Sequence, residues 1–154
     1  MKVESLPWDG GCRCGRVRFR ISAPPLLTGA CHCIGCQRMT GGAFSLAVVV
    51  SDDAFKVTAG EPVIGGLHGE VPHYFCPYCM SWMFTRVPGT PMVNVRATML
   101  DDTTGFEPFV ETYTSEKLPW VTTAAVHSFG KFPSFEDYGK LTQEFVAWAQ
   151  KTVT

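Results

Sequence analysis

Cys31-His32-Cys33-Ile34-Gly35-Cys36 is the middle one of three tight cysteine clusters, and these clusters decide the fold. The other two are Cys12-Arg13-Cys14 and Cys76-Pro77-Tyr78-Cys79, so the clusters contain all seven cysteines of the chain. Thiols set one or two residues apart suit a shared metal ion, because local turns bring their sulfurs within a few ångströms. Four thiolates complete a closed tetrahedral zinc site, and the remaining three make a site with one open position.

The first and last clusters fit one structural zinc site. On an extended strand Cys12 and Cys14 point to the same face, and the flanking Gly11 and Gly15 let the backbone bend around an ion. Two ligands are too few, and the Cys-x-x-Cys turn at 76–79 is the natural partner. The two pairs together predict a four-thiolate zinc that ties together segments over 60 residues apart.

Cys76-Pro77-Tyr78-Cys79 also fits the redox motif of glutaredoxins, in which a lowered thiol pKa drives disulfide exchange. That chemistry usually sits where a strand leads into a helix. Here the following residues, SWMFTRVPG (81–89), are typical of a strand, and no βαβ pattern surrounds them. The pattern therefore favours zinc ligation, with a redox role as the alternative.

The middle cluster can place three thiolates around a second ion. Cys31 and Cys33 share the i, i+2 relation, and Cys36 follows a short turn at Gly35. On an extended backbone His32 points the other way, which predicts a packing or supporting role. An open fourth position would take water or a substrate thiol, whose pKa zinc depresses. Spacing does not exclude a second closed site, completed by a carboxylate or by a histidine: His32, His68, His73 or His127.

Most of the chain has the pattern of short strands separated by Gly and Pro. Val17, Phe19 and Ile21 alternate with arginines, and AFSLAVVV (43–50) is typical of a buried strand. Further strands are expected at 55–58, 74–75, 82–85, 92–95 and 109–113. The sequence thus predicts a mainly β fold.

One helix is expected, at the C-terminus. Ser134 can cap it, and Leu141, Phe145 and Trp148 recur at helical spacing. This apolar face is predicted to pack on the core.

Composition and charge restrict the function. With 154 residues, 45% hydrophobic and 18% charged, the chain is expected to form one globular domain. A net charge of −1 gives no electrostatic basis for a nucleic-acid partner. The N-terminus lacks a signal-peptide pattern, and the apolar stretch at 43–50 is far shorter than the roughly 20 residues that span a bilayer. We therefore expect no membrane partner and a cytoplasmic location that keeps the thiols reduced.

The ordered motifs resemble the glutathione-dependent formaldehyde-activating enzyme family, also called the centromere protein V-like domain family. The resemblance is carried by GCRCG (11–15), CHCIGCQRMTGGAFS (31–45), FCPYC (75–79), VNVRATMLDD (93–102) and LPW (118–120). It covers about residues 9–121. The helix at about 134–151 would be a C-terminal extension of a single domain over 1–154.

The resemblance implies a small zinc-stabilised, β-tent-like domain that holds two zinc ions. It implies a structural zinc on Cys12, Cys14, Cys76 and Cys79, and a catalytic zinc with an open position on Cys31, Cys33 and Cys36. The implied activity is the condensation of formaldehyde with glutathione to S-(hydroxymethyl)glutathione, a carbon–sulfur lyase reaction whose partner is a small thiol. The alternatives are a non-catalytic two-zinc binding module and a glutaredoxin-like oxidoreductase acting through Cys76 and Cys79.

The chain departs from the family pattern near the predicted sites. Met80 stands where a glycine commonly follows the last cysteine, at a position where such turns need a positive φ. Glu111 and Tyr113 stand where related sequences often carry His and Trp, so substrate preference is expected to differ. Because glutathione carries two carboxylates, Arg38 is the predicted substrate contact, and Phe44 is a second candidate for shaping the pocket.

Overall fold

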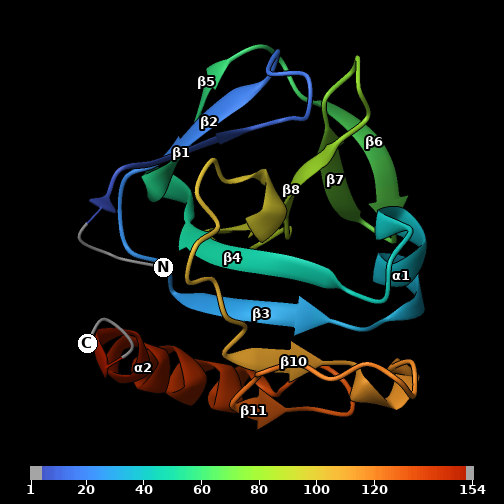
Figure 1. The fold of residues 1–154 in the computed structure, drawn as a ribbon, viewed down its shortest axis with the longest axis vertical. Helices are drawn as coiled ribbons and strands as arrows, with labels where there is room; N and C mark the ends of the chain where they lie inside the picture. Colours follow the sequence, from blue (N-terminus) through green and yellow to red (C-terminus); the bar gives the residue numbers. More distant parts are fainter. Residues whose placement is uncertain (1–4, 152–154) are drawn as a thin grey trace.

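The strand patterns of the sequence form two β-sheets in the computed structural model, which describes residues 5–151 (Figure 1). The smaller sheet has the order β1-β2-β5, formed by β1 (Trp8–Gly11), β2 (Arg18–Ile21) and β5 (Phe55–Ala59). Its neighbouring strands are antiparallel. The predicted mainly β fold with a C-terminal helix is confirmed.

The larger sheet contains the remaining strands and carries the candidate functional site. Its eight strands lie in the spatial order β11 (His127–Ser128), β10 (Val110–Thr112), β3 (Leu27–Cys31), β4 (Ser45–Ser51), β9 (Met92–Arg96), β8 (Trp82–Arg86), β7 (Val71–Phe75) and β6 (Val63–His68). Strand β10 runs parallel to β3 and to β11, whereas the pairs from β3 to β6 are antiparallel.

The alternating segment at residues 16–21 shows why the two sheets pack together. Phe19 and Ile21 are fully buried, while Arg18 and Arg20 form ion pairs at the surface. The buried side chains of β2 and β5 join those of β4, β8 and β9 in one apolar cluster. The period of two therefore places an apolar face of the small sheet on the large sheet, as burial of apolar surface requires.

Helix α2 (Phe135–Lys151) covers the β10–β11 end of the large sheet (Figure 1). The hydroxyl of Ser134 accepts a hydrogen bond from the Asp137 amide at 3.1 Å, the N-cap contact expected for this residue. Leu141 and Phe145 are buried in a second apolar cluster, where the Phe145 ring lies 5.5 Å from the ring of Phe109. The predicted core-facing side of this helix is thus observed.

A second helix, α1 (Ile34–Thr40), was not expected from the sequence, because seven residues containing a glycine and two β-branched ends have weak helix propensity. Its ends are fixed by local contacts instead. The Cys33 sulfur accepts the Cys36 amide at 3.3 Å, and Gly41 adopts a left-handed φ of 62° at the C-terminal cap. Strands β1, β3 and β6 were not predicted either, since glycines interrupt their apolar pattern.

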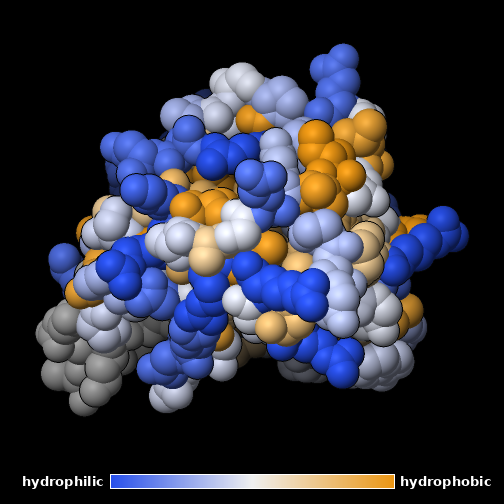
Figure 2. Space-filling view, turned by 90° about the horizontal axis from the view of Figure 1, so that it is seen from above, coloured by the Kyte–Doolittle hydropathy of each residue, from blue (hydrophilic) through white to orange (hydrophobic). Residues whose placement is uncertain are grey.

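The remaining local helices are single 3₁₀ turns: η2 (Asp52–Ala54), η3 (Ala97–Met99) and η4 (Thr114–Glu116). The predicted domain range of 1–154 extends at both ends beyond the described residues. Within residues 5–151, the chain has no helix with the length and apolar character needed to cross a membrane. Viewed from above the orientation of Figure 1, the surface is mainly hydrophilic, with separate groups of apolar side chains near the centre and at the upper right (Figure 2).

Candidate metal centres

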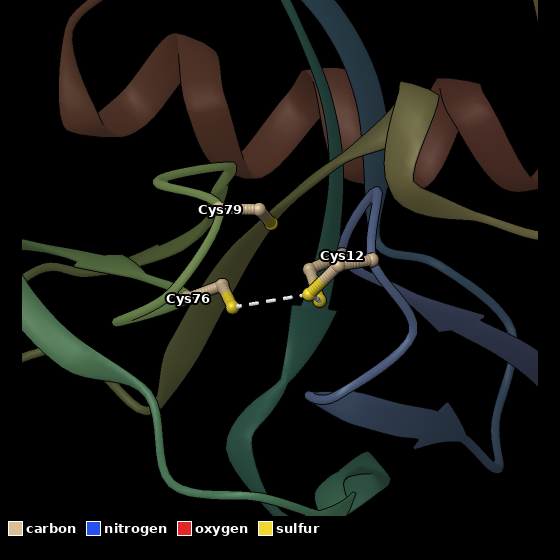
Figure 3. Close-up of side chains that lie close together, drawn as sticks. Cys12, Cys76 and Cys79 are labelled. Carbon is tan, nitrogen blue, oxygen red and sulfur yellow. Dashed lines mark hydrogen bonds between the residues drawn. The ribbon is translucent and has the colours of Figure 1, made fainter.

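Cys12, Cys14, Cys76 and Cys79 converge from two distant segments, as their spacing predicted. The first pair lies in the loop between β1 and β2, and the second pair lies in the turn between β7 and β8, with sulfurs directed toward one another (Figure 3). The sulfurs of Cys12 and Cys14 are 3.4 Å apart, and those of Cys14 and Cys76 are 3.8 Å apart. All four lie within 4.8 Å of one another. Tetrahedral zinc with bonds of about 2.3 Å separates its sulfurs by about 3.8 Å, so this group fits zinc.

Backbone hydrogen bonds shape both turns of this four-cysteine group. The Val17 amide points at the Cys12 sulfur at 3.3 Å, and the Met80 amide donates to the Cys76 carbonyl at 3.0 Å. The hydroxyl of Ser81 lies 3.2 Å from the Cys79 sulfur and lowers the pKa of that thiol to about 5. Met80 adopts a φ of 55°, the left-handed conformation that was expected at this position of the turn.

Cys31, Cys33 and Cys36 form a second group at the junction of β3 and α1. Strand β3 ends at Cys31, Cys33 caps α1, and Cys36 lies in the first turn of that helix. The three sulfurs lie within 4.8 Å of one another. Hydrogen bonding from Cys36 lowers the pKa of the Cys31 thiol to about 5, and the same contact raises the pKa of Cys36. The group therefore releases a first proton readily, as a metal-binding thiol must.

No histidine, aspartate, glutamate or further cysteine joins this three-cysteine group among the side chains that the structure describes. His32 is fully buried with Nε2 3.0 Å from the carboxylate of Glu111. His127 pairs with Glu144, and His73 shares a hydrogen bond with the hydroxyl of Thr85. The side chain of His68 lies outside the described part. The geometry therefore offers three protein ligands to one ion.

Glu111 ties the segment behind the three-cysteine group into a buried polar network. Its carboxylate accepts hydrogen bonds from Lys117, Thr123 and Ser128, each at 2.7 Å, in addition to its contact with His32. Burial alone would raise the pKa of Glu111, but these donors outweigh it and hold the pKa at about 2. Glu111 is thus a permanent anion at neutral pH.

A cavity of about 610 Å³ opens beside the three-cysteine group. All three cysteines line it, together with side chains from β3, β4, β8, β9 and β10 and from the segment that leads into α2. Its volume is in the range of small-molecule sites, roughly 300–1,000 Å³. The three sulfurs are therefore accessible to a ligand of substantial size.

Arg96 is the buried cation of this cavity. Only 7% of the residue is exposed, and its hydrogen bonds run to the hydroxyl of Ser45 at 3.1 Å and the carbonyl of Asn94 at 3.2 Å. Its guanidinium lies 4.3 Å from the ring centre of Trp82, and its Nε atom has no hydrogen-bond partner among the described residues. Burial lowers the pKa of Arg96 to about 10, which leaves it charged at neutral pH. A buried charge of this kind is suited to hold or stabilise an anion.

The loop after β10 forms another side of the cavity. Tyr113 adopts a φ of 57° and lines the cavity, and its pKa is raised by burial and by the neighbouring cysteines. Glu116 also lines the cavity and accepts the Ile34 amide at 2.6 Å, which ties this loop to α1. The loop that contains Tyr113 and Glu116 thus reaches the cavity.

The predicted substrate contacts Arg38 and Phe44 lie elsewhere. Arg38 is exposed on α1, and the Phe44 ring packs edge-on against His32 with ring centres 5.4 Å apart. Neither is among the cavity-lining residues, and their predicted contact with substrate stays a prediction. Sequence reasoning missed Arg96, whose one signal was an arginine directly after VNV (93–95), the end of a predicted strand in which two valines flank Asn94.

Comparison with known proteins identifies relatives of this chain. The family model described as glutathione-dependent formaldehyde-activating enzyme matches residues 7–116. A protein of Halomonas elongata, named "Putative glutathione-dependent formaldehyde-activating enzyme", is 30% identical over 103 residues. That match covers 60% of this chain and 65% of the relative's length.

A solved structure has a similar fold. The crystal structure of a Rhodobacter sphaeroides protein from a structural genomics programme superposes with a TM-score of 0.50 at 21% identity. The match covers 65% of this chain and 91% of that one. At this identity the likeness concerns the fold.

Proposed function

This chain belongs to the glutathione-dependent formaldehyde-activating enzyme family, and from this premise we propose that it is a zinc-dependent enzyme acting on a carbon–sulfur bond. The reaction is the condensation of formaldehyde with glutathione, or with a related small thiol, to an S-hydroxymethyl adduct, which is a lyase-type reaction. The observation that carries the proposal is the group Cys31, Cys33 and Cys36, which opens on a cavity containing a buried arginine.

Two zinc ions are part of the proposal. Cys12, Cys14, Cys76 and Cys79 would hold a structural ion that links the small sheet to the β7–β8 turn. Cys31, Cys33 and Cys36 would hold the second ion and leave one coordination position for a ligand. Zinc bound there supplies a Lewis acid and lowers the pKa of a thiol or water in the open position.

The residues around the three-cysteine group have defined roles in this proposal. The substrate sulfur, as thiolate, adds to the carbonyl carbon, so that a C–S bond forms while the π pair moves to the carbonyl oxygen. Arg96 stabilises the negative charge that develops on that oxygen, and Ser45 orients the guanidinium. Water then protonates the oxygen. Because Arg96 is preorganised and buried, its charge acts more strongly than it would in solvent.

A non-catalytic two-zinc binding module is the principal alternative. It would need the four-cysteine group for folding but no accessible second group, and the cavity beside Cys31 is the observation against it. A glutaredoxin-like role for Cys76 and Cys79 is less well supported, because their turn joins antiparallel strands β7 and β8. Their sulfurs also lie in the four-cysteine group rather than alone. A reducing, cytoplasmic location belongs to the proposal because metal-binding thiols must stay reduced.

Exchange NMR with ¹³C-formaldehyde and glutathione tests the proposed function. The purified zinc-loaded protein should accelerate exchange between hydrated formaldehyde and S-(hydroxymethyl)glutathione above the uncatalysed rate. Cys33→Ser at equal concentration should return the rate to background and lose one equivalent of zinc. Equal exchange with the wild type, with the variant and without protein would disprove the activity.

A further inference from the structure

We propose that the cavity beside Cys31, Cys33 and Cys36 accommodates the apolar side chain of an aldehyde larger than formaldehyde. The inference rests on the proposed function and names the substrate class of the same site. Its basis is the order of side chains along one face of the large sheet, which changes from sulfur through small residues to apolar residues. Formaldehyde has no side chain that could use the apolar part.

The strand register places the cavity floor in rows. Cys31 is opposite Ser45 in the β3–β4 pair, and these residues form the sulfur row. Two residues earlier along β3, Gly29 is opposite Ala47, and these two form the small row. Ala47 is in turn opposite Arg96 on β9. Residues two apart in a strand point to the same face, so both rows face the cavity. The small row therefore makes a hollow directly beside the sulfurs, with the guanidinium at its edge.

The next row is apolar where it crosses β3 and β4, whereas Asn94, opposite Val49 on β9, and Thr85, opposite Asn94 on β8, give it a polar end. Leu27 is opposite Val49, and both line the cavity beyond the small row. Phe132, Pro133 and Tyr138 add side chains from the segment that enters α2, with the rings of Phe132 and Tyr138 stacked at 5.8 Å. Burial of an apolar group against such surfaces is favourable, at about 25 cal/mol per Å². This part of the cavity suits a hydrocarbon chain or an aromatic ring.

The charge distribution argues against glutathione as the occupant of the apolar part. Glutathione carries two carboxylates and an ammonium group, and each would lose its hydration among Leu27, Val49 and Phe132. Arg96 lies next to the sulfur row, where it faces a reacting carbonyl oxygen rather than the far end of the cavity. We therefore place the thiol at the sulfur row and the aldehyde side chain against Leu27, Val49 and Phe132.

The wall that includes Phe132, Pro133 and Tyr138 lies outside the family-matched residues 7–116. This part of the wall thus comes from a segment outside the family match, whereas the three cysteines lie within it. The reaction balances: a thiol RSH and an aldehyde R′CHO give RS–CH(OH)R′. One C–S bond forms, and the carbonyl π pair and the thiol's proton become the O–H bond. The reverse step breaks that C–S bond and needs no further reactant.

Fluorine NMR with two fluorinated probes tests the inference. Binding of unreactive 4-fluorobenzyl alcohol to zinc-loaded protein is measured from ¹⁹F line broadening, and exchange is measured with 4-fluorobenzaldehyde plus glutathione. We expect saturable binding and accelerated exchange for the wild type. Ala47→Leu, which fills the small row, should weaken probe binding by about tenfold or more and reduce exchange of 4-fluorobenzaldehyde relative to formaldehyde by a similar factor.

Two further variants keep the test decisive. Phe132→Ala removes a 59% exposed side chain that packing does not require, and it should weaken probe binding several-fold. Ala147→Leu makes the same change as Ala47→Leu on the exposed side of α2 and should bind like the wild type. Two results would overturn the inference and leave the proposed function standing. In the first, formaldehyde exchange is accelerated but the probe does not bind saturably. In the second, exchange is accelerated but neither Ala47→Leu nor Phe132→Ala changes probe binding. Cavity-dependent probe binding without exchange of either aldehyde would overturn the proposed function while supporting the ligand class.

Discussion

His32 and Glu111 meet at 3.0 Å behind the three-cysteine group, although 79 residues separate them in the chain. His32 lies between two of the candidate zinc ligands, so the position of its ring is coupled to the end of β3. Glu111 lies on β10, the parallel neighbour of β3, and its carboxylate is fixed by three further donors. The pair therefore joins the ligand segment to the neighbouring strand.

Glu111→Gln is predicted to lower the free energy of unfolding at pH 7 by on the order of 2–3 kcal/mol, because it removes the charge that Lys117, Thr123 and Ser128 stabilise. The folded pKa of about 2 lies below the ordinary value of 4.5. The carboxylate's contribution is therefore complete above about pH 4.5 and is lost as the pH falls toward 2. Urea denaturation at pH 7 and pH 3 measures the difference in the free energy of unfolding between wild type and variant, which should be smaller at pH 3.

Glu136→Gln is the matched control for that experiment. Glu136 is exposed on α2 and its ion pair with Lys140 joins side chains that are 81% and 62% exposed. Such pairs contribute little, so this variant should unfold like the wild type at both pH values. If Glu111→Gln did not lower the free energy of unfolding at pH 7, or lowered it more at pH 3 than at pH 7, the role given to the Glu111 hydrogen bonds would be contradicted.

The candidate metal-ligand groups were predictable in part, because the cysteines within each cluster are closely spaced. Two cysteines at i, i+2 or i, i+3 fix their own separation, whatever the rest of the fold does. The apolar alternation at Phe19 and Ile21 likewise determined which face of β2 is buried. Met80 was predictable as a strained position, since the Cys-x-x-Cys turn itself requires the positive φ.

Contacts that depend on strand order could not be predicted. Arg96 reaches the sulfur row only because β9 pairs with β4 and β4 pairs with β3, and no local pattern specifies that order. The contact between His32 and Glu111 likewise requires the parallel pairing of β10 with β3. Arg38, predicted as a substrate contact from its proximity to Cys36 in sequence, is exposed on α1, and its contact with substrate stays a prediction.

Met80→Gly is predicted to raise the free energy of unfolding by about 1 kcal/mol, because glycine adopts the left-handed conformation at φ 55° without the Cβ penalty. Met80 is 56% exposed, so little packing is lost. Thermal or urea unfolding of zinc-loaded protein measures the gain. Lys56→Gly, on an exposed site in β5, should instead destabilise by roughly 0.5–1 kcal/mol. Equal destabilisation by both changes would show that the turn does not constrain Met80.

Cys76→Ser and Cys33→Ser are predicted to have different effects on stability. Each should remove about one of two bound zinc equivalents, measured by atomic absorption. Cys76 is fully buried and links distant segments, so its loss should lower the melting temperature by more than about 10 °C. Retention of both zinc ions in either variant would refute that ligand set.

Cys33→Ser should change the melting temperature much less. The segment around Cys33 is also held by hydrogen bonds from Gln37 to the carbonyls of His32 and Glu116, at 2.6 and 3.0 Å. The Ile34 amide adds a contact to the Glu116 carboxylate. A loss of stability equal to that of Cys76→Ser would indicate that the three-cysteine group is structural as well.

Arg96→Met is predicted to lower kcat/KM for aldehyde exchange by about 10²-fold, because it removes the one buried cation placed to stabilise the developing oxyanion. Arg96→Lys keeps the charge but loses the fork that contacts both Ser45 and Asn94, so it should restore only part of the rate. Arg86→Met, at an exposed ion pair with Asp52, is the control for the same change outside the cavity.

Zinc content distinguishes the proposed role of Arg96 in stabilising the oxyanion from a simpler role in balancing the charge of the metal site. Three thiolates on one zinc carry a net charge of −1, and a nearby guanidinium could serve only to balance it. In that case Arg96→Met would release the second zinc, and the loss of rate would follow the loss of metal. If Arg96 acts on the substrate, the variant keeps both zinc equivalents while kcat falls, and the same rate loss appears at saturating thiol. Measurement of kcat per bound zinc in wild type, Arg96→Met and Arg96→Lys therefore decides whether the buried cation acts on the metal site or on the reacting carbonyl.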